Sequence, residues 1–95
     1  MTMHILLMQL EIHPPNCHSL KEKRSVMKPL LNELRRDYNV SASEVDAHDV
    51  WQSGVIAVVC VAGMKSACEK NERDVLNVIE THAEAQLAVY KAEWL

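Results

Sequence analysis

The sequence contains no phenylalanine, and its aromatic residues are two tryptophans and two tyrosines. Domains that bind single-stranded RNA on a β-sheet stack the bases on aromatic side chains of that sheet. The segment richest in β-branched residues, residues 55–62, contains no aromatic residue, so base stacking on it is excluded. Glycine is also scarce, because Gly54 and Gly63 are the only two in the chain. This scarcity excludes the glycine-rich phosphate loop and the dinucleotide-binding fingerprint, since each needs closely spaced glycines.

The three cysteines, Cys17, Cys60 and Cys68, form no Cys-x-x-Cys pair. An odd number of cysteines is not typical of a disulfide framework, so the reducing cytoplasm is the expected location. A long hydrophobic run is also missing. The apolar residues 1–10 have no Lys or Arg before them and reach Glu11 too soon for a membrane-spanning segment. We therefore expect a cytoplasmic protein with no membrane partner.

The 95 residues, 48% of them hydrophobic, are enough for one hydrophobic core. Two cores would leave each half too small to fold without a metal or disulfides, so residues 1–95 are predicted to form a single domain. Acidic residues outnumber basic ones by 13 to 10, which gives a formal net charge of −3. This balance excludes binding to nucleic acid through overall charge and leaves only a local basic patch for such a role.

Two helices are predicted from capping residues and hydrophobic spacing. Ser19 and Glu22 form a capping box, after which apolar residues recur at helical spacing to about Tyr38. Pro29 lies inside this helix, where we expect a kink or a looser turn. The second helix is predicted to follow a cap at Ser66, with an apolar face that continues to residue 82.

Four strands are predicted over residues 3–12, 40–45, 55–62 and 86–95. The resulting order, βαββαβ, predicts an α+β fold in which a four-stranded antiparallel sheet has both helices on one face. The other face should be polar in a monomer, yet the first and third strands are apolar on both sides. We therefore expect a homodimer through the open sheet face, unless strand twist and the chain ends cover it. The expected interface residues are Ile5, Leu7, Val55, Ala57, Val59, Val61 and Val89.

A basic stripe is predicted on the first helix. At about 100° per residue, Lys21, Arg24, Lys28 and Arg35 fall within an arc of about 60° on a straight helix. We group Lys23 with them as a candidate binding site for phosphate or RNA, aided by the N–H groups at the start of the helix. The alternative is an ordinary solvated face whose charge is balanced by acidic neighbours.

Other groupings carry weaker signals. Asp46, His48 and Asp49 could perform acid-base chemistry or bind a metal, but a polar connection between strands explains them more simply. Trp51 is interpreted as a packing anchor for that connection.

The segment from His13 to His18, which includes Cys17, matches no established zinc pattern. Cys60 is predicted to lie in the core and Cys68 to be partly exposed on the second helix. The sequence therefore predicts no catalytic residue, metal or cofactor.

The chain resembles the YlxP family, a bacterial domain family of unknown function. The resemblance depends on a Ser-Leu-Lys-x-Lys-Arg run followed by Glu-Val and Trp-Gln elements. It implies a ferredoxin-like fold but no activity. Members of the family tend to be encoded beside translation and ribosome-maturation genes, and this implies an association with ribosomal RNA or the small subunit. The sequence departs from the family in its His-Pro-Pro-Asn-Cys-His turn and its acidic balance. The motif positions are Ser19, Leu20, Lys21, Lys23, Arg24, Glu44, Trp51 and Gln52.

Three functional hypotheses follow. The first is a non-enzymatic binding module that contacts ribosomal RNA or a ribosomal partner through the basic stripe. The second is a regulatory domain that binds a small ligand between the subunits of a dimer. An enzyme ranks last, because nothing in the sequence positions a substrate.

Overall fold

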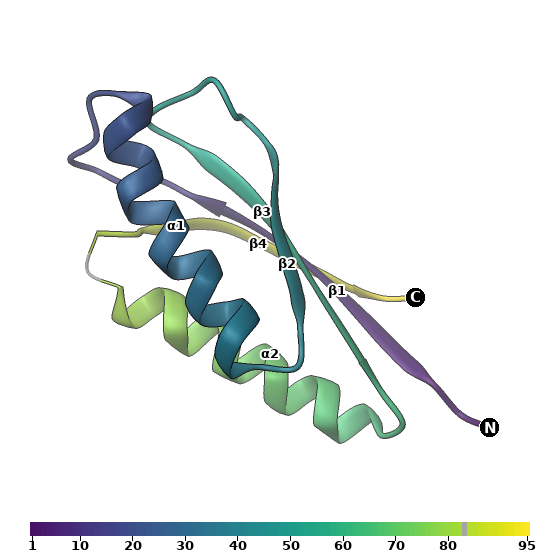
Figure 1. Ribbon diagram of the computed structural model, residues 1–95. Coiled ribbons are helices and arrows are strands. Elements are labelled where there is room, and N and C mark those ends of the chain that lie inside the picture. Colours follow the sequence, from purple (N-terminus) through teal and green to yellow (C-terminus); the bar gives the residue numbers. More distant parts are fainter. Residues whose placement is uncertain (83) are drawn as a thin grey trace.

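The computed structural model describes residues 1–82 and 84–95. Along the chain it contains the strand β1 (His4–Ile12), the helix α1 (Leu20–Asp37), the strands β2 (Ser41–Asp46) and β3 (Gly54–Ala62), the helix α2 (Lys65–Thr81) and the strand β4 (Leu87–Trp94) (Figure 1). This is the βαββαβ order that the sequence predicts. The strand boundaries differ from the predicted ones by no more than one residue at each end.

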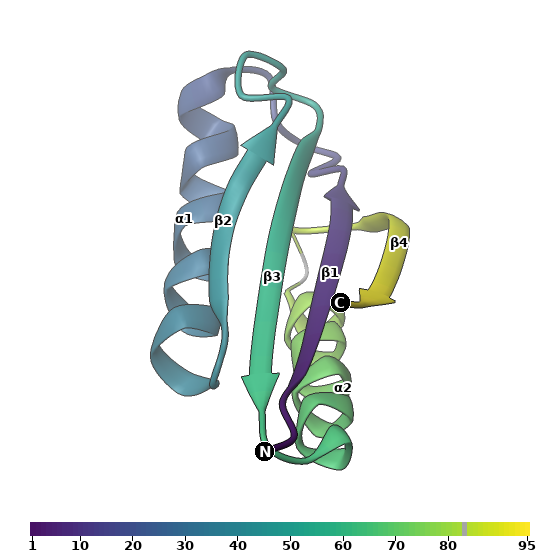
Figure 2. The same ribbon diagram turned by 90° about the vertical axis from the view of Figure 1, so that its right-hand side faces the viewer.

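The four strands form one antiparallel sheet in the order β2-β3-β1-β4. β1 and β3 are paired along their whole length, from His4 opposite Ala62 to Ile12 opposite Gly54. Both helices lie on the same face of the sheet, and the opposite face carries no helix (Figures 1 and 2). The predicted fold class is therefore confirmed.

The core lies between the sheet and the two helices. β1 alternates, so that Leu6, Met8, Leu10 and Ile12 are buried against the helices. β3 contributes Ile56, Val58 and Cys60 in the same layer, because these residues pair with the buried positions of β1. The helices complete the core with their apolar faces, chiefly Met27, Leu30 and Leu34 from α1 and Val75, Val78 and Ile79 from α2.

The start of α1 has the predicted cap. The Oγ atom of Ser19 accepts a hydrogen bond of 3.1 Å from the backbone N–H of Glu22. The Glu22 carboxylate in turn accepts the backbone N–H of His18 at 2.8 Å, one residue earlier than in an ideal capping box. Although we expected a kink or a looser turn at Pro29, α1 continues as a single helix of 18 residues through that position.

Two predictions for the second helix are wrong. α2 begins at Lys65, so Ser66 lies inside its first turn, and the N-cap position is occupied by Met64, which makes no side-chain capping bond. Cys68 is fully buried rather than partly exposed, because the first turn of α2 packs against β1 and β3. Neither α1 nor α2 has the combination of length and hydropathy that crossing a bilayer requires, within the chain as described.

Candidate nucleic-acid interface

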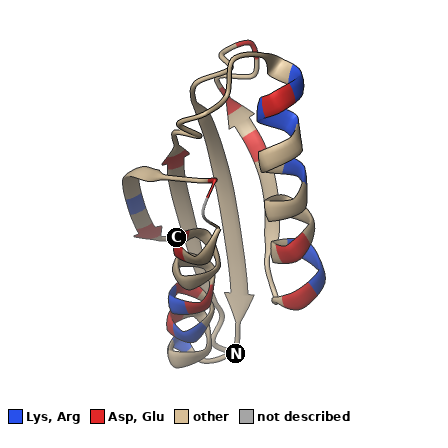
Figure 3. Ribbon diagram, turned by 90° about the vertical axis from the view of Figure 1, so that its left-hand side faces the viewer, with Lys and Arg blue, Asp and Glu red and all other residues tan. Residues whose placement is uncertain are grey.

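Positive charge is concentrated on α1. Six of the ten Lys and Arg residues of the chain lie on this helix, together with three acidic residues. α2 has three basic and four acidic residues, and β3 has no charged residue at all. Figure 3 shows the basic bands along α1 next to a largely uncharged sheet. The molecule is thus acidic as a whole but has one helix with a net positive charge.

The Lys23 side chain is not exposed like the other basic side chains of α1. The prediction that it belongs to a phosphate-binding site is therefore wrong. Its side chain is 2% exposed, and its Nζ atom lies 2.8 Å from the Glu44 carboxylate on β2. The same ammonium donates hydrogen bonds to the carbonyl oxygens of Ala47 at 2.7 Å and Val50 at 2.9 Å. The ammonium therefore has one ion-pair partner and two hydrogen-bond acceptors within the protein.

The position of Lys23 on the helix explains its burial. Counted at about 100° per residue, Lys23 points between Leu30 and Leu34, in the middle of the apolar face of α1. Gly54 leaves room for the buried ion pair, because a Cβ atom there would lie 3.3 Å from the Glu44 carboxylate and 3.0 Å from Met27. Lys23 therefore fixes the β2–β3 loop against α1 and is a structural residue.

The remaining basic side chains of the predicted stripe are exposed. Lys21, Arg24, Lys28 and Arg35 all lie on the outer side of α1. Over residues 1–82 and 84–95, no carboxylate lies within salt-bridge distance of any of them. The stripe without Lys23 is hereafter called the α1 ridge, and its members are Lys21, Arg24, Lys28 and Arg35. Its charges are thus available to an external anion.

A groove between α1 and the end of α2 runs along one side of the α1 ridge. It has a volume of about 450 Å³, and its lining includes Arg24, Lys28, Asn32, Arg36 and His82. The four α1 residues among these are spaced four apart, and such a row lies along one side of a helix. The sequence-based interpretation missed Asn32, Arg36 and His82, although the spacing of four was a signal for the first two.

Two charged pairs lie in or beside this groove. Arg36 binds its neighbour Asp37 through two hydrogen bonds of 2.8 and 2.9 Å, which raise the pKa of the arginine and lower that of the aspartate. The His82 ring lies 3.4 Å from the Glu33 carboxylate. Arg36 is therefore partly neutralised, and Arg24 and Lys28 supply the uncompensated charge.

A smaller hollow of about 180 Å³ lies on the other side of the α1 ridge, toward β2. Arg24 and Lys28 line it as well, together with Arg35 and the carboxylate-bearing Glu44. The Nε atom of Arg35 donates a 2.8 Å hydrogen bond to the carbonyl oxygen of Ala42. This bond anchors Arg35 to the edge strand and leaves the two terminal nitrogens of its guanidinium for other contacts.

The N-terminus of α1 does not suit an anion, contrary to the expectation that its N–H groups would assist. The hollow beside it, about 200 Å³, is lined by Cys17, Glu22 and Glu84 among others. Burial raises the pKa of the Cys17 thiol, and the charges of Glu22 and Glu84 raise it further. The carboxylate of Glu22 already occupies the positive end of the helix. The exposed positive charge of α1 is therefore that of the α1 ridge side chains and not that of the helix N-terminus.

The acidic segment around His48 does not form an acid-base pair. The Asp46 carboxylate accepts the backbone N–H of Ala47 at 2.7 Å, and the His48 ring lies 3.2 Å from the carbonyl oxygen of Glu44. Ala47 has a φ of 60°, in the left-handed region, and the hydrogen bond from the Lys23 ammonium to its carbonyl oxygen holds it there. Asp46 and His48 thus have a role in the conformation of the loop.

The residues considered for metal binding are engaged separately. The His13 ring lies 3.0 Å from Glu11, and the His18 ring packs against Trp51 with 5.9 Å between centroids. Cys17 is buried. In the part of the chain that the structure describes, no three His, Cys, Asp or Glu residues are grouped so as to hold a metal ion.

The second predicted surface lies on the opposite side of the molecule. The strand register places the residues of the expected dimer interface on the sheet face that carries no helix, where Ile5 pairs with Val61, Leu7 with Val59, and Glu11 with both Val55 and Val89. Ala57, opposite Gln9, completes the set. We call this surface the open sheet face.

The fold and this arrangement of helices define a ferredoxin-like α+β domain. The chain belongs to the family described as "Protein of unknown function (DUF503)", whose model matches residues 5–92. It is also similar to the uncharacterized protein YlxP of Bacillus subtilis (strain 168), with 34% identity over 76 residues that cover 80% of this chain and 83% of the relative. The YlxP resemblance is therefore confirmed, and neither description names an activity.

Solved structures share the fold at low sequence identity. The de novo designed protein Foldit4 matches with a TM-score of 0.56 at 12% identity, over 96% of each chain. A mutant form of SnoaB, a cofactor-independent oxygenase from Streptomyces nogalater, matches with a TM-score of 0.52 at 12% identity, over 100% of this chain and 92% of its own. A designed protein and an oxygenase with one fold illustrate that the fold alone implies no function.

Proposed function

We propose that this protein is a non-enzymatic binding module that contacts ribosomal RNA through the α1 ridge. The observation that carries the proposal is the exposed row Lys21, Arg24, Lys28, in which no side chain has a carboxylate partner among the described residues. An RNA backbone is a row of phosphates, and Lys and Arg side chains bind it by displacing counterions.

The surroundings of the ridge favour contact with the RNA backbone over contact with bases. Arg24 and Lys28 lie between two hollows, so that phosphates on either side of the helix are within reach of the same two side chains. Asn32 adds a hydrogen-bonding side chain in the larger groove. The two central strands have no aromatic pair to stack bases, because β1 and β3 contain no Phe, Tyr or Trp. Tyr90 and Trp94 of β4 pair with Leu10 and Leu6 and therefore lie on the side of the sheet that carries the helices. Recognition through backbone and shape is the mode that remains.

The family setting supports the choice of ribosomal RNA among possible RNAs. The resemblance to the YlxP family implies a genomic neighbourhood of translation and ribosome-maturation functions, which is an associational argument. The acidic balance of the rest of the molecule restricts the contact to α1, since the remaining surface repels phosphate.

The test is co-sedimentation of the purified protein with ribosomal subunits at low salt. We expect the wild-type protein to travel with a subunit and the double variant Arg24→Glu/Lys28→Glu to remain at the top of the gradient. The matched control is Lys70→Glu/Arg73→Glu, which reverses two exposed charges on α2 and is expected to bind as the wild type does.

Folding is checked by thermal unfolding. All four side chains are exposed, and the Lys70–Asp74 ion pair that the control breaks is a surface pair, so the melting temperature should change little in either variant. If the wild-type protein fails to sediment with either subunit at low salt, the proposal is wrong. Equal loss of binding in the α2 control would also contradict it, because the contact would then depend on net charge alone.

A further inference from the structure

The centre of the open sheet face is aliphatic, and nothing in the described chain covers it. Val61 is 49% exposed and Val89 44% exposed, and Val45 on the edge strand β2 is 51% exposed. Between them lie the side chains of Leu7 and Val59, which are opposite each other on the two central strands. β3 presents only apolar side chains to this face. Contiguous apolar surface of this kind is typical of an interface.

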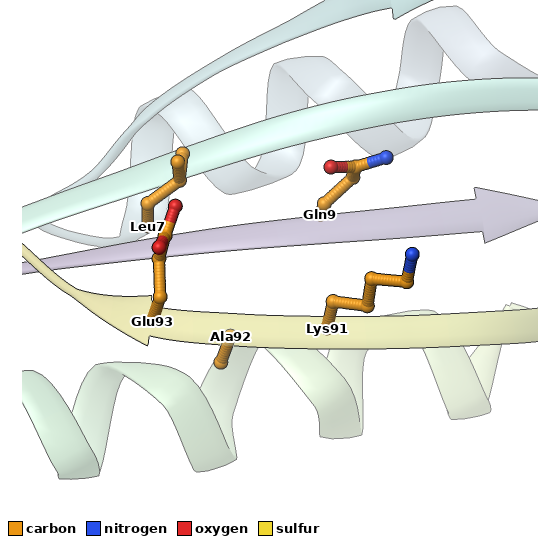
Figure 4. Close-up of a pocket in the computed structure, with 5 residues that line it drawn as sticks. All are labelled: Leu7, Gln9, Lys91, Ala92 and Glu93. Atoms are coloured by element: carbon orange, nitrogen blue, oxygen red, sulfur yellow. The ribbon is translucent and has the colours of Figure 1, made fainter.

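The open sheet face also carries polar residues, on the edge strands β2 and β4 and at the end of β1. Ser41 and Ser43 of β2 are opposite Val59 and Ala57, and Glu11 of β1 is opposite Val89. Gln9 pairs with Lys91, and Leu7 pairs with Glu93, so that a positive and a negative side chain lie two residues apart on one strand. Figure 4 shows Leu7, Gln9, Lys91 and Glu93 projecting from the same side of the sheet. They line a shallow hollow of about 290 Å³. The aliphatic part of the face and this pair of opposite charges are next to each other.

We propose that the open sheet face binds a second copy of the same chain, which gives a homodimer with its two sheets packed face to face. A two-fold interface brings the same patch of both copies together, so the patch must be complementary to itself. Lys91 and Glu93 satisfy this requirement, because a two-fold axis between them places the Lys91 side chain of each copy over the partner's Glu93. The aliphatic side chains of β3 then pack against β3 of the other copy, because the same axis crosses β3 near its middle.

The area of the face is sufficient for such a dimer. With a spacing of about 4.8 Å between strands and a rise of about 3.3 Å per residue, the four strands cover about 500 Å². Two copies therefore bury about 1,000 Å², which is at the lower limit for a specific interface between proteins. A small molecule is a poorer occupant, because the hollow has walls on only two strands and a volume at the lower limit of ligand pockets.

This dimer is a four-layer sandwich in which helices form the two outer layers. Because α1 lies on the opposite side of the sheet from the interface, each copy presents its α1 ridge outward. Dimer formation and contact with RNA therefore use separate surfaces. Each can be measured without the other, and the failure of one leaves the other in place.

The experiment is sedimentation equilibrium of the purified protein without RNA, at concentrations from about 1 to 200 µM. We expect a dimer that dissociates on dilution. Val61→Glu should abolish it, because two carboxylates would be buried against aliphatic surface, whereas the exposed position leaves the fold intact. The control is Arg73→Glu, which reverses an exposed charge on α2, away from the open sheet face. This variant should leave the dimer unchanged.

Charge exchange tests the pairing itself. Lys91→Glu and Glu93→Lys should each weaken the dimer at least tenfold, since like charges then face each other, and the double variant Lys91→Glu/Glu93→Lys should restore it. A wild-type monomer over the whole concentration range would overturn the proposal. So would a dimer that survives Val61→Glu, one that is lost in Arg73→Glu, or a double variant that remains as weak as the single ones.

Discussion

Lys23 shows how a single side chain decides which part of a basic helix is available for binding. Its ammonium contacts the Glu44 carboxylate and two loop carbonyl groups, so it joins α1 to the β2–β3 loop. The neighbouring Lys21 and Arg24 point outward and have no such partners among the described residues. Two lysines separated by one residue thus have different roles, because one lies on the apolar face of the helix and the other does not.

Removal of the Lys23 ammonium should destabilise the protein strongly. In Lys23→Ala the Glu44 carboxylate and the two carbonyl groups lose their donor in a largely buried place, and we expect a loss of about 3 kcal/mol in the free energy of unfolding. Lys21→Ala is the matched control on the same turn of α1, with an expected change below about 0.5 kcal/mol. Urea denaturation followed by circular dichroism measures both.

A second variant separates the ion pair from simple packing. Replacing both partners, as in Lys23→Met/Glu44→Leu, should cost less than the sum of the two single changes, because no charge is then left without its partner. Equal stability of Lys23→Ala and Lys21→Ala would refute the structural role of Lys23.

At the scale of elements, α2 is joined to the sheet by two groups that must remain protonated. The Cys68 thiol contacts the carbonyl oxygens of His4 on β1, at 3.6 Å, and of Cys60 on β3, at 3.8 Å. The Tyr90 hydroxyl on β4 donates a hydrogen bond to the Glu72 carboxylate on α2. Burial raises the pKa of Cys68 to about 11, and burial together with the bond to Glu72 raises the pKa of Tyr90 above its ordinary value.

Stability should therefore fall at alkaline pH. Both groups are neutral in the folded state at a pH where the unfolded chain has already lost the protons, so the folded state binds more protons above about pH 9. The free energy of unfolding should decrease between about pH 9 and 11 through Cys68, by up to about 1.4 kcal/mol per pH unit, and above about pH 10 Tyr90 should make the slope steeper. Urea denaturation over this range measures the slope, and Cys68→Ala should make it shallower. A slope that is the same in Cys68→Ala and wild type would contradict this account.

The sequence was sufficient to predict the elements, because their signals are local. Alternation in β1 and the cap at Ser19 depend on neighbouring residues, and both are found as predicted. The burial of Cys68 and of Lys23 depends on segments that are distant along the chain. Cys68 is covered by β1, which lies 64 residues away at His4, and the acceptors of Lys23 belong to a loop that follows β2. Helical spacing did hold one clue, since Lys23 falls between Leu30 and Leu34.

At the scale of the whole molecule, charge and apolar surface are segregated. One side carries the α1 ridge, the other side carries the open sheet face, and the core lies between them. Outside α1 acidic residues outnumber basic ones, so the contact with RNA that we propose would be made with α1 toward the RNA. In the dimer that we propose, a second ridge would lie on the far side, and two linked contacts would bind more tightly than one.

The salt dependence of binding to purified small-subunit ribosomal RNA tests the role of the α1 ridge most directly. We predict that log K falls linearly with log salt concentration, and that Arg24→Ala/Lys28→Ala lowers both the affinity and the magnitude of the slope, the slope by about 1 to 2. Fluorescence anisotropy over a KCl series gives both quantities. Unmeasurable binding at low salt, or a slope that is the same in the wild type and the double variant, would contradict the assignment of the ridge as an RNA-binding surface.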